Sequence, residues 1–502
     1  MQERYADTRI ERIWSNEELL LGWQTVEKAL IQARFNLKLM PEVDFRAIME
    51  ALDSTPPNVD CWKDWDNRLH HDLNAALKER MRFIPGDLQR WYHSGITSYD
   101  TEEAAMLRKI IMAIEIYEAE VVELLGVIKS QALKYRYTPM MGVTHGQWAD
   151  PQSFGKRLAC WHQELQMGLT LLRELKLKLI YSKMSGFVGN YTEITPEIEK
   201  EALRILGFKP YYGATQIVPR TLYVPVASTI GMMSKTIANI AMTIRLGARS
   251  ASVLYHEPFG KQQTGSTAGP HKRNTINDEK AGGMDIMITK YIEMIIACCG
   301  TWEERDIAHS SVERNAWPDL FHASIHQAKV MTKMIGGLVV YPKNMMLEIV
   351  KTNGCYAANV AKEQLKEWGE SYGLSAADCY KIFQLAAFNL SCPIQDEDIG
   401  NDPGLMDATL RSIEQEDCSG HARRNIQYHI SLGELEPSGV LDITDETIKV
   451  WNTKLRAIFD SVEVNERWDE VFSLKYLLRN EAKIFEEVFP EPEAHEEYVP
   501  GA

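Results

Sequence analysis

The segment "DTEEAAMLRKIIMAIEIYEAEVVELLGVIKSQALKY" (residues 100–135) decides the fold class of this chain. It runs for about 36 residues without a proline and without a glycine before Gly126, whereas an average helix has about 11 residues. The dominant period along the chain is helical. Because a helix of this length needs other helices to bury its apolar face, the segment predicts a bundle of long helices.

Comparable segments precede and follow it. Residues 15–41 open with Ser15 as an N-cap and Glu18 three residues later, and they close at Pro41. Further long helices are expected at residues 150–185, 224–253 and 276–299 and after Arg305. Strand-like alternation is scarce. The sequence therefore predicts an all-α, three-domain subunit, with an N-terminal helical domain at 1–96, a central long-helix bundle at 97–345 and a C-terminal helical domain at 346–502.

Composition limits the classes of partner. The chain has 502 residues, enough for two to four domains, and its 55 Lys and Arg against 70 Asp and Glu give a formal net charge of −15. A nucleic acid or an anionic membrane surface therefore has no global electrostatic attraction to it. Any anion-binding site must be local.

The remaining bulk features are typical of a soluble, cytoplasmic protein, which is our expectation. The eight cysteines form no CxxC pair, so reduced thiols are expected rather than a zinc ribbon or a disulfide framework. The first residues are charged and polar, unlike a signal peptide, and no uncharged apolar run approaches the ~20 residues of a membrane span. The acidic, proline-containing end at 491–502 is expected to fray.

Several expected helices are apolar on most of their surface. The segment "VASTIGMMSKTIANIAMTI" (226–244) carries small and apolar residues broadly, which is typical of helices buried against another chain. Oligomerisation is therefore favoured. This pattern alone is as consistent with a structural scaffold as with an enzyme.

Three polar loops interrupt the helices: "GITSYD" (95–100), "MGVTHGQWADPQSFGK" (141–156) and "TGSTAGPHKRN" (264–274). The first can cap the following helix, bind an anion, or do both. The second places His145 on an irregular segment before a helix start at Pro151, where it can be structural or catalytic. The third can close over an anion through backbone N–H groups and Lys272, or it can be a solvated basic turn.

Together the three loops resemble, in order, the active-site segments of the fumarase/aspartase superfamily. "GSTAGPHKRN" is similar to the signature loop of that family, and its His-Lys-Arg-Asn ending is similar to the adenylosuccinate lyase branch. Four further segments resemble that branch, namely "RYADTRIERIWS" (4–15), "RLHHDLNAAL" (68–77), "ATQIVPR" (214–220) and "WEERDIAHSSVERNAWPD" (302–319). The resemblance covers the chain from Arg4 to at least Asp319.

The resemblance implies cleavage of a carbon–nitrogen bond by anti elimination, with release of fumarate. Removal of a proton beside a carboxylate leaves an aci-carboxylate, whose extra charge needs a cation and N–H donors. By resemblance, Ser266 is the general base, Lys272 the stabilising cation and His145 the general acid. His71 holds a phosphate or helps to place the proton.

The resemblance also implies a substrate and an assembly. Adenylosuccinate carries two carboxylates and a phosphate and would yield fumarate and AMP; the succinyl-carboxamide ribotide of purine synthesis is a second candidate. The implied substrate-binding residues are Arg4, Tyr5, Asp72, Thr97, Ser98, Thr144, Gln216, Asn274, Arg305, Ser310 and Arg314. In this family the site is assembled from three chains of a homotetramer with a core of about twenty helices. No metal or organic cofactor is expected, because the sequence shows neither a metal-ligand cluster nor a dinucleotide-binding loop.

The chain departs from the family pattern at Gly269, where methionine is usual, at Thr275, where proline is usual, and at Ala308, where serine is usual. Glycine at 269 without proline at 275 makes the loop more flexible. Two other functions remain open. Another superfamily lyase or a carboxymuconate cycloisomerase would share the three loops without needing a phosphate site, and an inactive structural protein would share only the helices.

Overall fold

The computed structural model describes residues 1–391, 425–438 and 441–490. The chain divides into two compact units. The first comprises Met1–Ile128, Trp161–Leu246 and Glu257–Leu338, and the second comprises Lys129–Cys160, Gly247–His256 and Val339–Ala502. The end predicted to fray, at 491–502, lies outside the described residues, as do Cys392 and Cys418.

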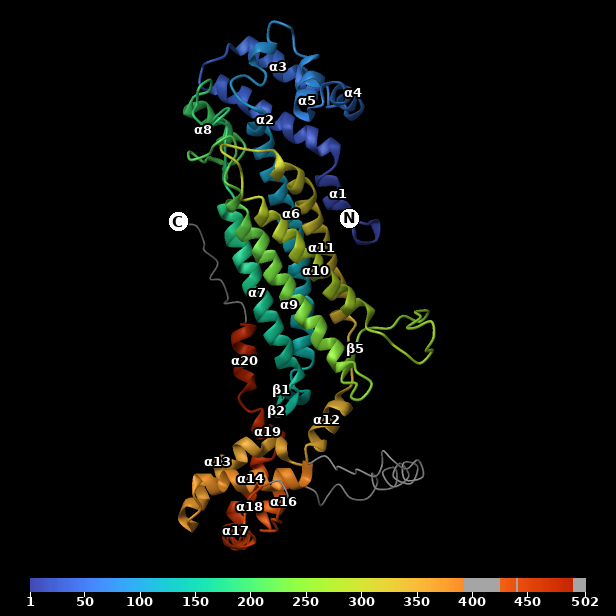
Figure 1. The fold of residues 1–502 in the computed structure, drawn as a ribbon, viewed down its shortest axis with the longest axis vertical. Helices are drawn as coiled ribbons and strands as arrows, with labels where there is room; N and C mark the ends of the chain where they lie inside the picture. The colour runs from blue at the N-terminus through green and yellow to red at the C-terminus, as the bar shows by residue number, and fades with distance from the viewer. Residues whose placement is uncertain (392–424, 439–440, 491–502) are drawn as a thin grey trace, which may run out of the picture. The chain divides into compact units, whose positions relative to one another are not determined.

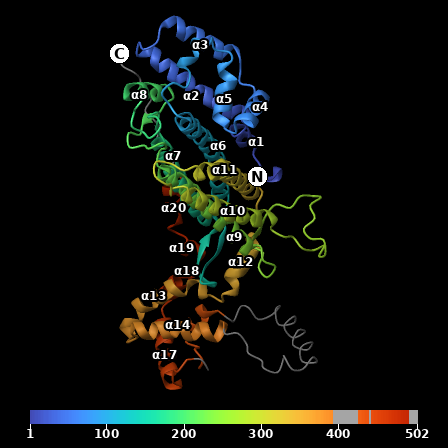
Figure 2. The ribbon, with the colours of Figure 1, turned by 45° about the horizontal axis from the view of Figure 1, so that its top comes forward.

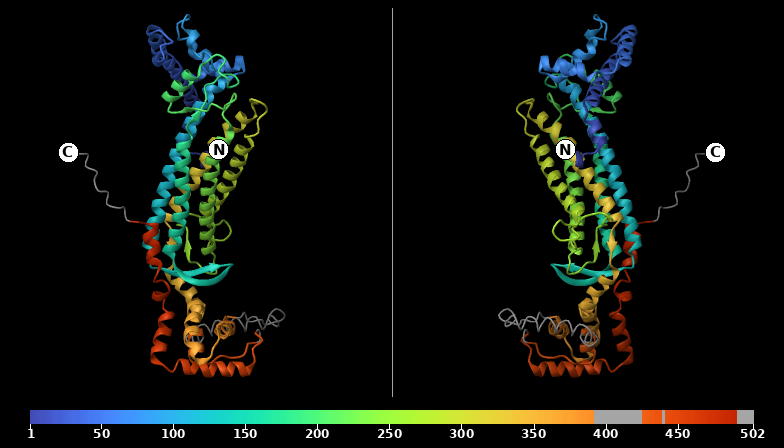
Figure 3. Two further views of the ribbon diagram at one scale, coloured as in Figure 1. Left: turned by 90° about the vertical axis from the view of Figure 1, so that its left-hand side faces the viewer. Right: turned by 90° about the vertical axis from the view of Figure 1, so that its right-hand side faces the viewer.

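Five long helices correspond to the five that the sequence predicts. They are α6 (Ser98–Lys134), α7 (Phe154–Lys178), α9 (Val224–Gly247), α10 (Ile276–Ala297) and α11 (Ala308–Gly336). In the first unit these helices run alongside one another, as the views in Figures 1 and 3 agree. The predicted all-α, helical-bundle class is confirmed.

The longest of them, α6, shows why the sequence folds this way. Its fully buried large apolar side chains are Leu107, Ile110, Ile114, Tyr117, Val121, Leu124 and Ile128. They recur at alternating spacings of three and four residues, so they form one continuous face of the helix. Each large aliphatic side chain that leaves water contributes about 1.5–3 kcal/mol, which makes this face the main source of stability for the helix.

Shorter helices gather at one end of the long ones in the first unit (Figure 2). They are α1 (Thr8–Ile13), α2 (Asn16–Asn36), α3 (Glu42–Ser54), α4 (Val59–Leu69), α5 (Asp72–Met81) and α8 (Pro196–Ile205). The predicted cap of α2 is confirmed, since Ser15 Oγ accepts the N–H of Glu18 at 3.2 Å. This helix ends at Asn36, before the predicted stop at Pro41. Strands β3 (Tyr181–Ser182) and β4 (Lys209–Pro210) form a short parallel pair.

The second unit contains a β-hairpin that the sequence analysis missed. Strands β1 (Pro139–Thr144) and β2 (Gln147–Ser153) pair antiparallel, with Thr144 opposite Gln147. The segment was expected to be irregular up to a helix start at Pro151, but Pro151 lies in β2 and α7 begins at Phe154. His145 and Gly146 form the two-residue turn with φ of 53° and 78°, the left-handed values that a tight hairpin requires.

The rest of the second unit is a smaller helical domain. Its helices are α12 (Pro342–Lys351), α13 (Ala358–Gly369), α14 (Ala376–Ser391), α16 (Ile426–Ser431), α17 (Asp445–Ile458), α18 (Val462–Val471), α19 (Leu474–Leu477) and α20 (Glu481–Val488), and β5 (Tyr255–His256) pairs with β6 (Val339–Val340). Trp468 lies at the centre of its core, with ring centroids 5.0 Å from Phe459 and 5.1 Å from Phe472. The division into three domains at residues 96 and 345 stays a prediction.

In the described part of the chain, no helix is long and apolar enough to cross a membrane. The cysteines of this part, namely Cys61, Cys160, Cys298, Cys299, Cys355 and Cys379, are free thiols.

Candidate active site

The first unit holds an open cavity of about 650 Å³, which we call the first cavity. The residues that line it are Asp66, Asn67, His70, His71, Asp72, Thr97, Ser98, Glu102, Phe187, Gln216, Arg305, Ile307, Ser310, Ser311 and Arg314. Segments far apart in sequence therefore meet here, namely the start of α5, the start of α6, the loop at Gln216 and the start of α11. Most of the predicted site residues that precede residue 100 or follow residue 300 line this cavity.

The start of α11 supplies the cationic side of this cavity. Ser310 and Arg314 are four residues apart and therefore share one face of the helix, as predicted. Nη2 of Arg314 lies 2.6 Å from Oδ2 of Asp72 and 3.6 Å from Oε2 of Glu102. Burial alone would lower the pKa of Arg314, but the charges of Asp72 and Glu102 raise it above its ordinary value. The guanidinium is thus a charged group held in place by two carboxylates.

Arg305 is positioned by contacts that the sequence did not indicate. Its Nη1 donates to Oε1 of Gln216 at 3.0 Å, and its guanidinium carbon lies 4.2 Å from the ring centroid of Tyr99. Cation–π contacts of this kind hold a guanidinium without neutralising it. Arg305 can therefore present its charge to an anion in the cavity. Gln216 also donates to the carbonyl oxygen of Phe187 at 3.0 Å.

A buried polar network lies under Tyr99. Its hydroxyl accepts from Arg220 Nη1 at 3.0 Å and lies 3.0 Å from Nε2 of His309. Arg220 is in turn bound to Glu103, with Nη2–Oε1 at 2.6 Å and both side chains almost fully buried. Such a network fixes the Tyr99 ring, and through it the guanidinium of Arg305. Tyr99 belongs to the "TSYD" motif, but the sequence of a capping segment does not reveal that the tyrosine ring contacts Arg305.

Glu102 is a further residue that the sequence analysis missed. Burial, and next the charge of Asp72, raise its pKa to about 7. Its carboxyl therefore changes charge near neutral pH beside Arg314. The signal available in the sequence was its position four residues after Ser98, which places both on one face of α6.

His71 and Asp72 begin α5. Nδ1 of His71 accepts the N–H of Asn74 at 3.4 Å as the N-cap, which orients the ring at the rim of the cavity. Asp72 caps the same end through Oδ1 and binds Arg314 through Oδ2. At the start of α6, the N–H of Thr97 donates to Oδ2 of Asp100 at 2.8 Å, and Thr97 and Ser98 both line the cavity.

The signature loop (residues 264–274) is closed on itself. Asn274 Nδ2 donates to the carbonyl oxygen of Gly265 at 2.9 Å, and Ser266 Oγ accepts the N–H of Gly269 at 3.1 Å. Only glycine fits at 265, because a Cβ atom there would lie 2.0 Å from the carbonyl oxygen of Lys272. The Lys272 side chain is exposed. The loop is therefore arranged by its own backbone, with Ser266 already in contact with an N–H dipole.

Helix α10 separates this loop from the first cavity. The loop precedes Ile276 at the start of α10, and Arg305 follows Ala297 at its end. The 22 residues of the helix span about 33 Å at 1.5 Å per residue. Figure 1 shows the loop and the start of α11 at opposite ends of α10. A single chain therefore does not bring Ser266 and Lys272 to Arg305.

One other predicted pair in the first unit also lies away from the cavity. Arg4 and Tyr5 lie in a short 3₁₀ helix (Glu3–Tyr5), where the Tyr5 ring packs edge-on against His326 at 5.1 Å. His326 follows Arg314 by 12 residues on α11, or about 18 Å. Thr144 and His145 belong to the second unit, where both are exposed at the tip of the β1–β2 hairpin. In the described residues no group of three or more His, Cys, Asp and Glu side chains is placed to hold a metal ion.

Comparisons with known proteins agree with these motifs. The model of a lyase family matches residues 1–288. The adenylosuccinate lyase of Thermotoga maritima is 30% identical over 404 residues, covering 80% of this chain and 93% of its own length. The adenylosuccinate lyase of Synechocystis is 30% identical over 387 residues, covering 77% of this chain and 88% of its own length. The chain belongs to the lyase family of the fumarase/aspartase superfamily, on its adenylosuccinate lyase branch.

Solved structures share the fold at lower identity. Fumarate lyase from Mesorhizobium aligns with a TM-score of 0.68 at 17% identity, covering 93% of this chain and 98% of that one. The 3-carboxy-cis,cis-muconate lactonizing enzyme from Pseudomonas putida aligns with a TM-score of 0.67 at 19% identity, covering 93% and 97%. At these identities the likeness concerns the fold alone.

Proposed function

We propose that this chain cleaves adenylosuccinate to fumarate and AMP by anti elimination, and that it also acts on the succinyl-carboxamide ribotide of purine synthesis. The observation that carries the proposal is the first cavity. Arg305, Ser310, Arg314, Thr97 and Ser98 all line it, and this set of donors supports a substrate with a phosphate and two carboxylates. Arginine presents paired N–H donors that suit both kinds of anion.

In the proposed reaction, Ser266 removes the proton on the carbon beside a succinyl carboxylate. The electron pair of that C–H bond forms the carbon–carbon double bond of fumarate, and the pair of the C–N bond leaves with the nitrogen. The negative charge that Ser266 needs is supported by the N–H of Gly269 and by Lys272. His145 protonates the leaving nitrogen.

The remaining predicted residues have binding roles in this proposal. Thr97, Ser98, Thr144, Lys272 and Asn274 hold the carboxylates that become fumarate, and Gln216 contacts the substrate beside them. His71, Arg305, Ser310 and Arg314, together with Arg4 and Tyr5, hold the nucleotide end. Asp72 acts through Arg314, whose guanidinium it holds at 2.6 Å.

We also propose that the active enzyme is a homotetramer in the cytoplasm, with each site built from three chains. The length of α10 supports this, because it separates Ser266 from Arg305 within one chain, so that Ser266 would have to come from another copy. Exposed apolar side chains support it too, as they follow the outer faces of three long helices. They are Met167, Leu171 and Leu177 on α7, Met232, Met242 and Leu246 on α9, and Ile286, Met294 and Ile296 on α10. Such patches mark protein interfaces.

A turnover assay tests the proposal. Adenylosuccinate added to the purified protein without metal or organic cofactor is expected to yield equimolar fumarate and AMP, which absorbance and chromatography detect. A cycloisomerase or a lyase for another succinyl compound shares the fold and is the alternative. No fumarate from adenylosuccinate, alongside turnover of 3-carboxy-cis,cis-muconate or another N-succinyl amine, would decide for that alternative.

A further inference from the structure

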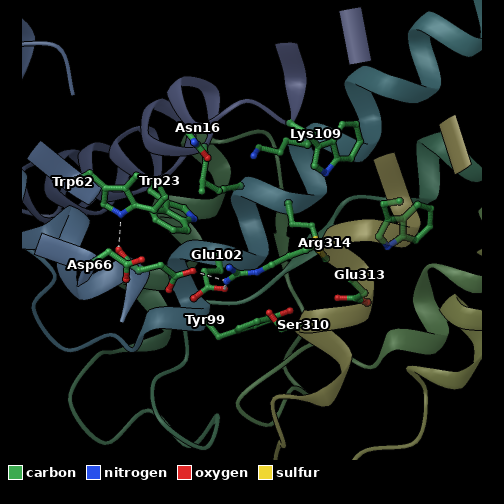
Figure 4. A pocket seen from close by; sticks show the side chains of 16 residues that line it. Asn16, Trp23, Trp62, Asp66, Tyr99, Glu102, Lys109, Ser310, Glu313 and Arg314 are labelled. Carbon is green, nitrogen blue, oxygen red and sulfur yellow. Dashed lines mark hydrogen bonds and ion pairs between the residues drawn. The ribbon is translucent and has the colours of Figure 1, made fainter. Parts of the chain in front are cut away.

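Figure 4 shows a cavity of about 310 Å³ beside the first cavity, in which the side chain of Arg314 extends from α11 toward Glu102. The two cavities share several lining residues, namely Asp66, Asp72, Glu102, Ser310 and Arg314. The cavity in Figure 4 therefore belongs to the site already described. Another cavity of about 530 Å³, which we call the α2–α8 cavity, lies in the first unit and shares no residue with either. None of the roles proposed above uses it.

Four helices of the first unit form the walls of the α2–α8 cavity. Residues of α2, α3 and α6 line it, together with the last residue of α8 and the turn that follows. Figures 1 and 2 both show α8 beside α2. In the turn, Gly207 is exposed with a φ of 83°, and a Cβ atom there would meet no heavy atom within 4 Å. The cavity is therefore open to solvent beside this turn.

Most of the side chains that line this cavity are apolar. They include Met49, Ile111, Met112, Ile205, Leu206 and Phe208. Aliphatic and methionine side chains predominate over aromatic rings, and methionine adapts its shape to what it contacts. The volume lies within the roughly 300–1,000 Å³ of small-molecule sites. A flexible alkyl chain therefore suits this wall better than a flat ring does.

The charged residues that line the cavity, Lys28 and Arg108, are both cations. Nζ of Lys28 is paired with Oδ1 of Asp53. Arg108 makes no hydrogen bond or ion pair with any described residue, and its neighbours one turn away on α6 are Ala104, Ala105, Ile111 and Met112. In a chain with a formal net charge of −15, an unpaired guanidinium beside an apolar cavity favours an anion from outside the chain.

These features define what the ligand must offer. One unpaired guanidinium matches one anionic group, and its planar N–H donors fit a carboxylate through two parallel hydrogen bonds. The apolar wall matches an unbranched hydrocarbon chain, because each methylene that leaves water contributes to binding. An inorganic anion would leave the wall uncovered, and an uncharged hydrocarbon would leave Arg108 unpaired.

We propose that the α2–α8 cavity binds a free medium-chain carboxylic acid as its anion. The alkyl chain packs against Ile111, Met112 and Phe208, and the carboxylate accepts hydrogen bonds from the exposed guanidinium of Arg108. Lys28 adds a second positive charge to the same lining. This site is separate from the elimination site and does not depend on which succinyl compound the enzyme cleaves.

Calorimetric titration of the full-length protein with decanoate tests the proposal. Saturable binding is expected, and the affinity should rise about threefold to fourfold for each methylene from hexanoate to decanoate. Arg108→Met should weaken decanoate binding roughly threefold to tenfold, because a partly exposed charge contact with the ligand is lost. Arg467→Met, on the exposed surface of α18, is the matched control and should leave the affinity unchanged.

Two variants at one position separate the effect of charge from that of apolar contact. Ile205→Glu and Ile205→Lys both remove a 36% exposed side chain at the end of α8, but they add opposite charges to the lining. Decanoate should bind Ile205→Glu about fivefold or more weakly than Ile205→Lys. Circular dichroism and thermal melting check that each variant is folded.

Three results would overturn the proposal. The first is no saturable binding of decanoate at millimolar concentration, and the second is equal binding by the natural protein and Arg108→Met. The third is binding of decanol, which has the chain without the charge, as tight as that of decanoate, because this would indicate unspecific apolar adsorption. A failure to cleave adenylosuccinate would leave all three readouts unaffected, since they measure binding.

Discussion

At Ser266 the hydroxyl oxygen already accepts the N–H of Gly269. A hydroxyl is a weak base, and burial would oppose its ionisation, so a donor and a cation must favour the charged form. The loop supplies the donor by its own turn, and Lys272 lies on the same loop. This arrangement of a glycine-rich, cationic segment before α10 suits the base role that we propose for Ser266.

Ser266→Ala is expected to lower kcat by several decades while binding of adenylosuccinate persists, because the variant loses the proposed base and keeps the first cavity. Single-turnover kinetics and equilibrium binding measure the two effects separately. Thr267→Ala, the neighbouring exposed hydroxyl, is the matched control and should keep kcat within a few-fold. If Thr267→Ala lowered kcat by several decades and Ser266→Ala did not, Thr267 would be the base.

At Glu102, the carboxyl group beside Arg314 changes its charge with pH. With a pKa of about 7, the carboxyl is ionised above neutral pH, where it would compete for the guanidinium with the substrate phosphate that we propose Arg314 binds. Below pH 7 the Glu102 carboxyl is mostly neutral and no longer competes for the Arg314 guanidinium. Phosphate itself titrates near pH 6, so its effect must be removed by comparison with a variant.

Glu102→Gln is therefore expected to remove a pH dependence. From pH 8 to pH 6, the ratio of the KM of the natural protein to that of Glu102→Gln should fall by roughly threefold to tenfold. Initial rates with adenylosuccinate at matched ionic strength measure this ratio. A ratio that stays constant across the range would mean that Glu102 does not compete for Arg314.

At the scale of elements, α10 separates Ser266 from Arg305, and its first turn holds a buried carboxyl group without a hydrogen-bond partner in the described residues. Asp278 in its first turn is 1% exposed, and neither carboxyl oxygen has a hydrogen-bond partner in the described part of the chain. Burial, and next the charge of Glu257, raise its pKa from 3.8 to about 8. Since the folded state holds a proton that the unfolded state releases, this group lowers stability as pH rises from about 4 to about 8.

Asp278→Asn should raise thermal stability, and the gain should grow from pH 5 to pH 9. Because asparagine has no proton to lose, the gain should grow by at most about 1.4 kcal/mol per pH unit up to about pH 8. Differential scanning calorimetry at several pH values measures the gain. Glu279→Gln, the next residue on the helix surface, is the control and should show little change. An equal gain at all pH values would contradict the proposed ionisation.

The elements also show how far the sequence could predict the structure. The long helices were predictable because α6 repeats buried residues at three and four positions over its whole length. The β1–β2 hairpin was not, because each strand is short and Pro151 suggested a helix start. The two-residue turn at His145-Gly146 was the available signal.

At the candidate site, the sequence predicted which residue types belong there by their motifs. It could not predict the supporting groups, because Tyr99, Glu102 and Arg220 act through burial and contacts between distant segments. Nor could the motifs alone show that Ser266 and Arg305 lie at opposite ends of α10. That separation follows from the helix length, which became certain only with the helix boundaries.

For the whole molecule, the separation leads to the central claim that one site is built from several copies of the chain. Ser266→Ala should be inactive, and Arg314→Ala should lose about 30- to 150-fold in kcat/KM, from a charge-assisted contact of about 2–3 kcal/mol. Two such variants lack different parts of the site. In a mixed oligomer, one copy can therefore supply Ser266 and another can supply Arg314.

Mixing the two variants tests this claim most directly. Equal amounts are co-expressed with different tags, purified through both tags, and assayed for fumarate release at low adenylosuccinate. If each site takes Ser266 and Arg314 from different copies, random assembly restores about a quarter of the natural kcat/KM. Activity no greater than the sum of the two separate variants, in oligomers that contain both chains, would contradict the claim.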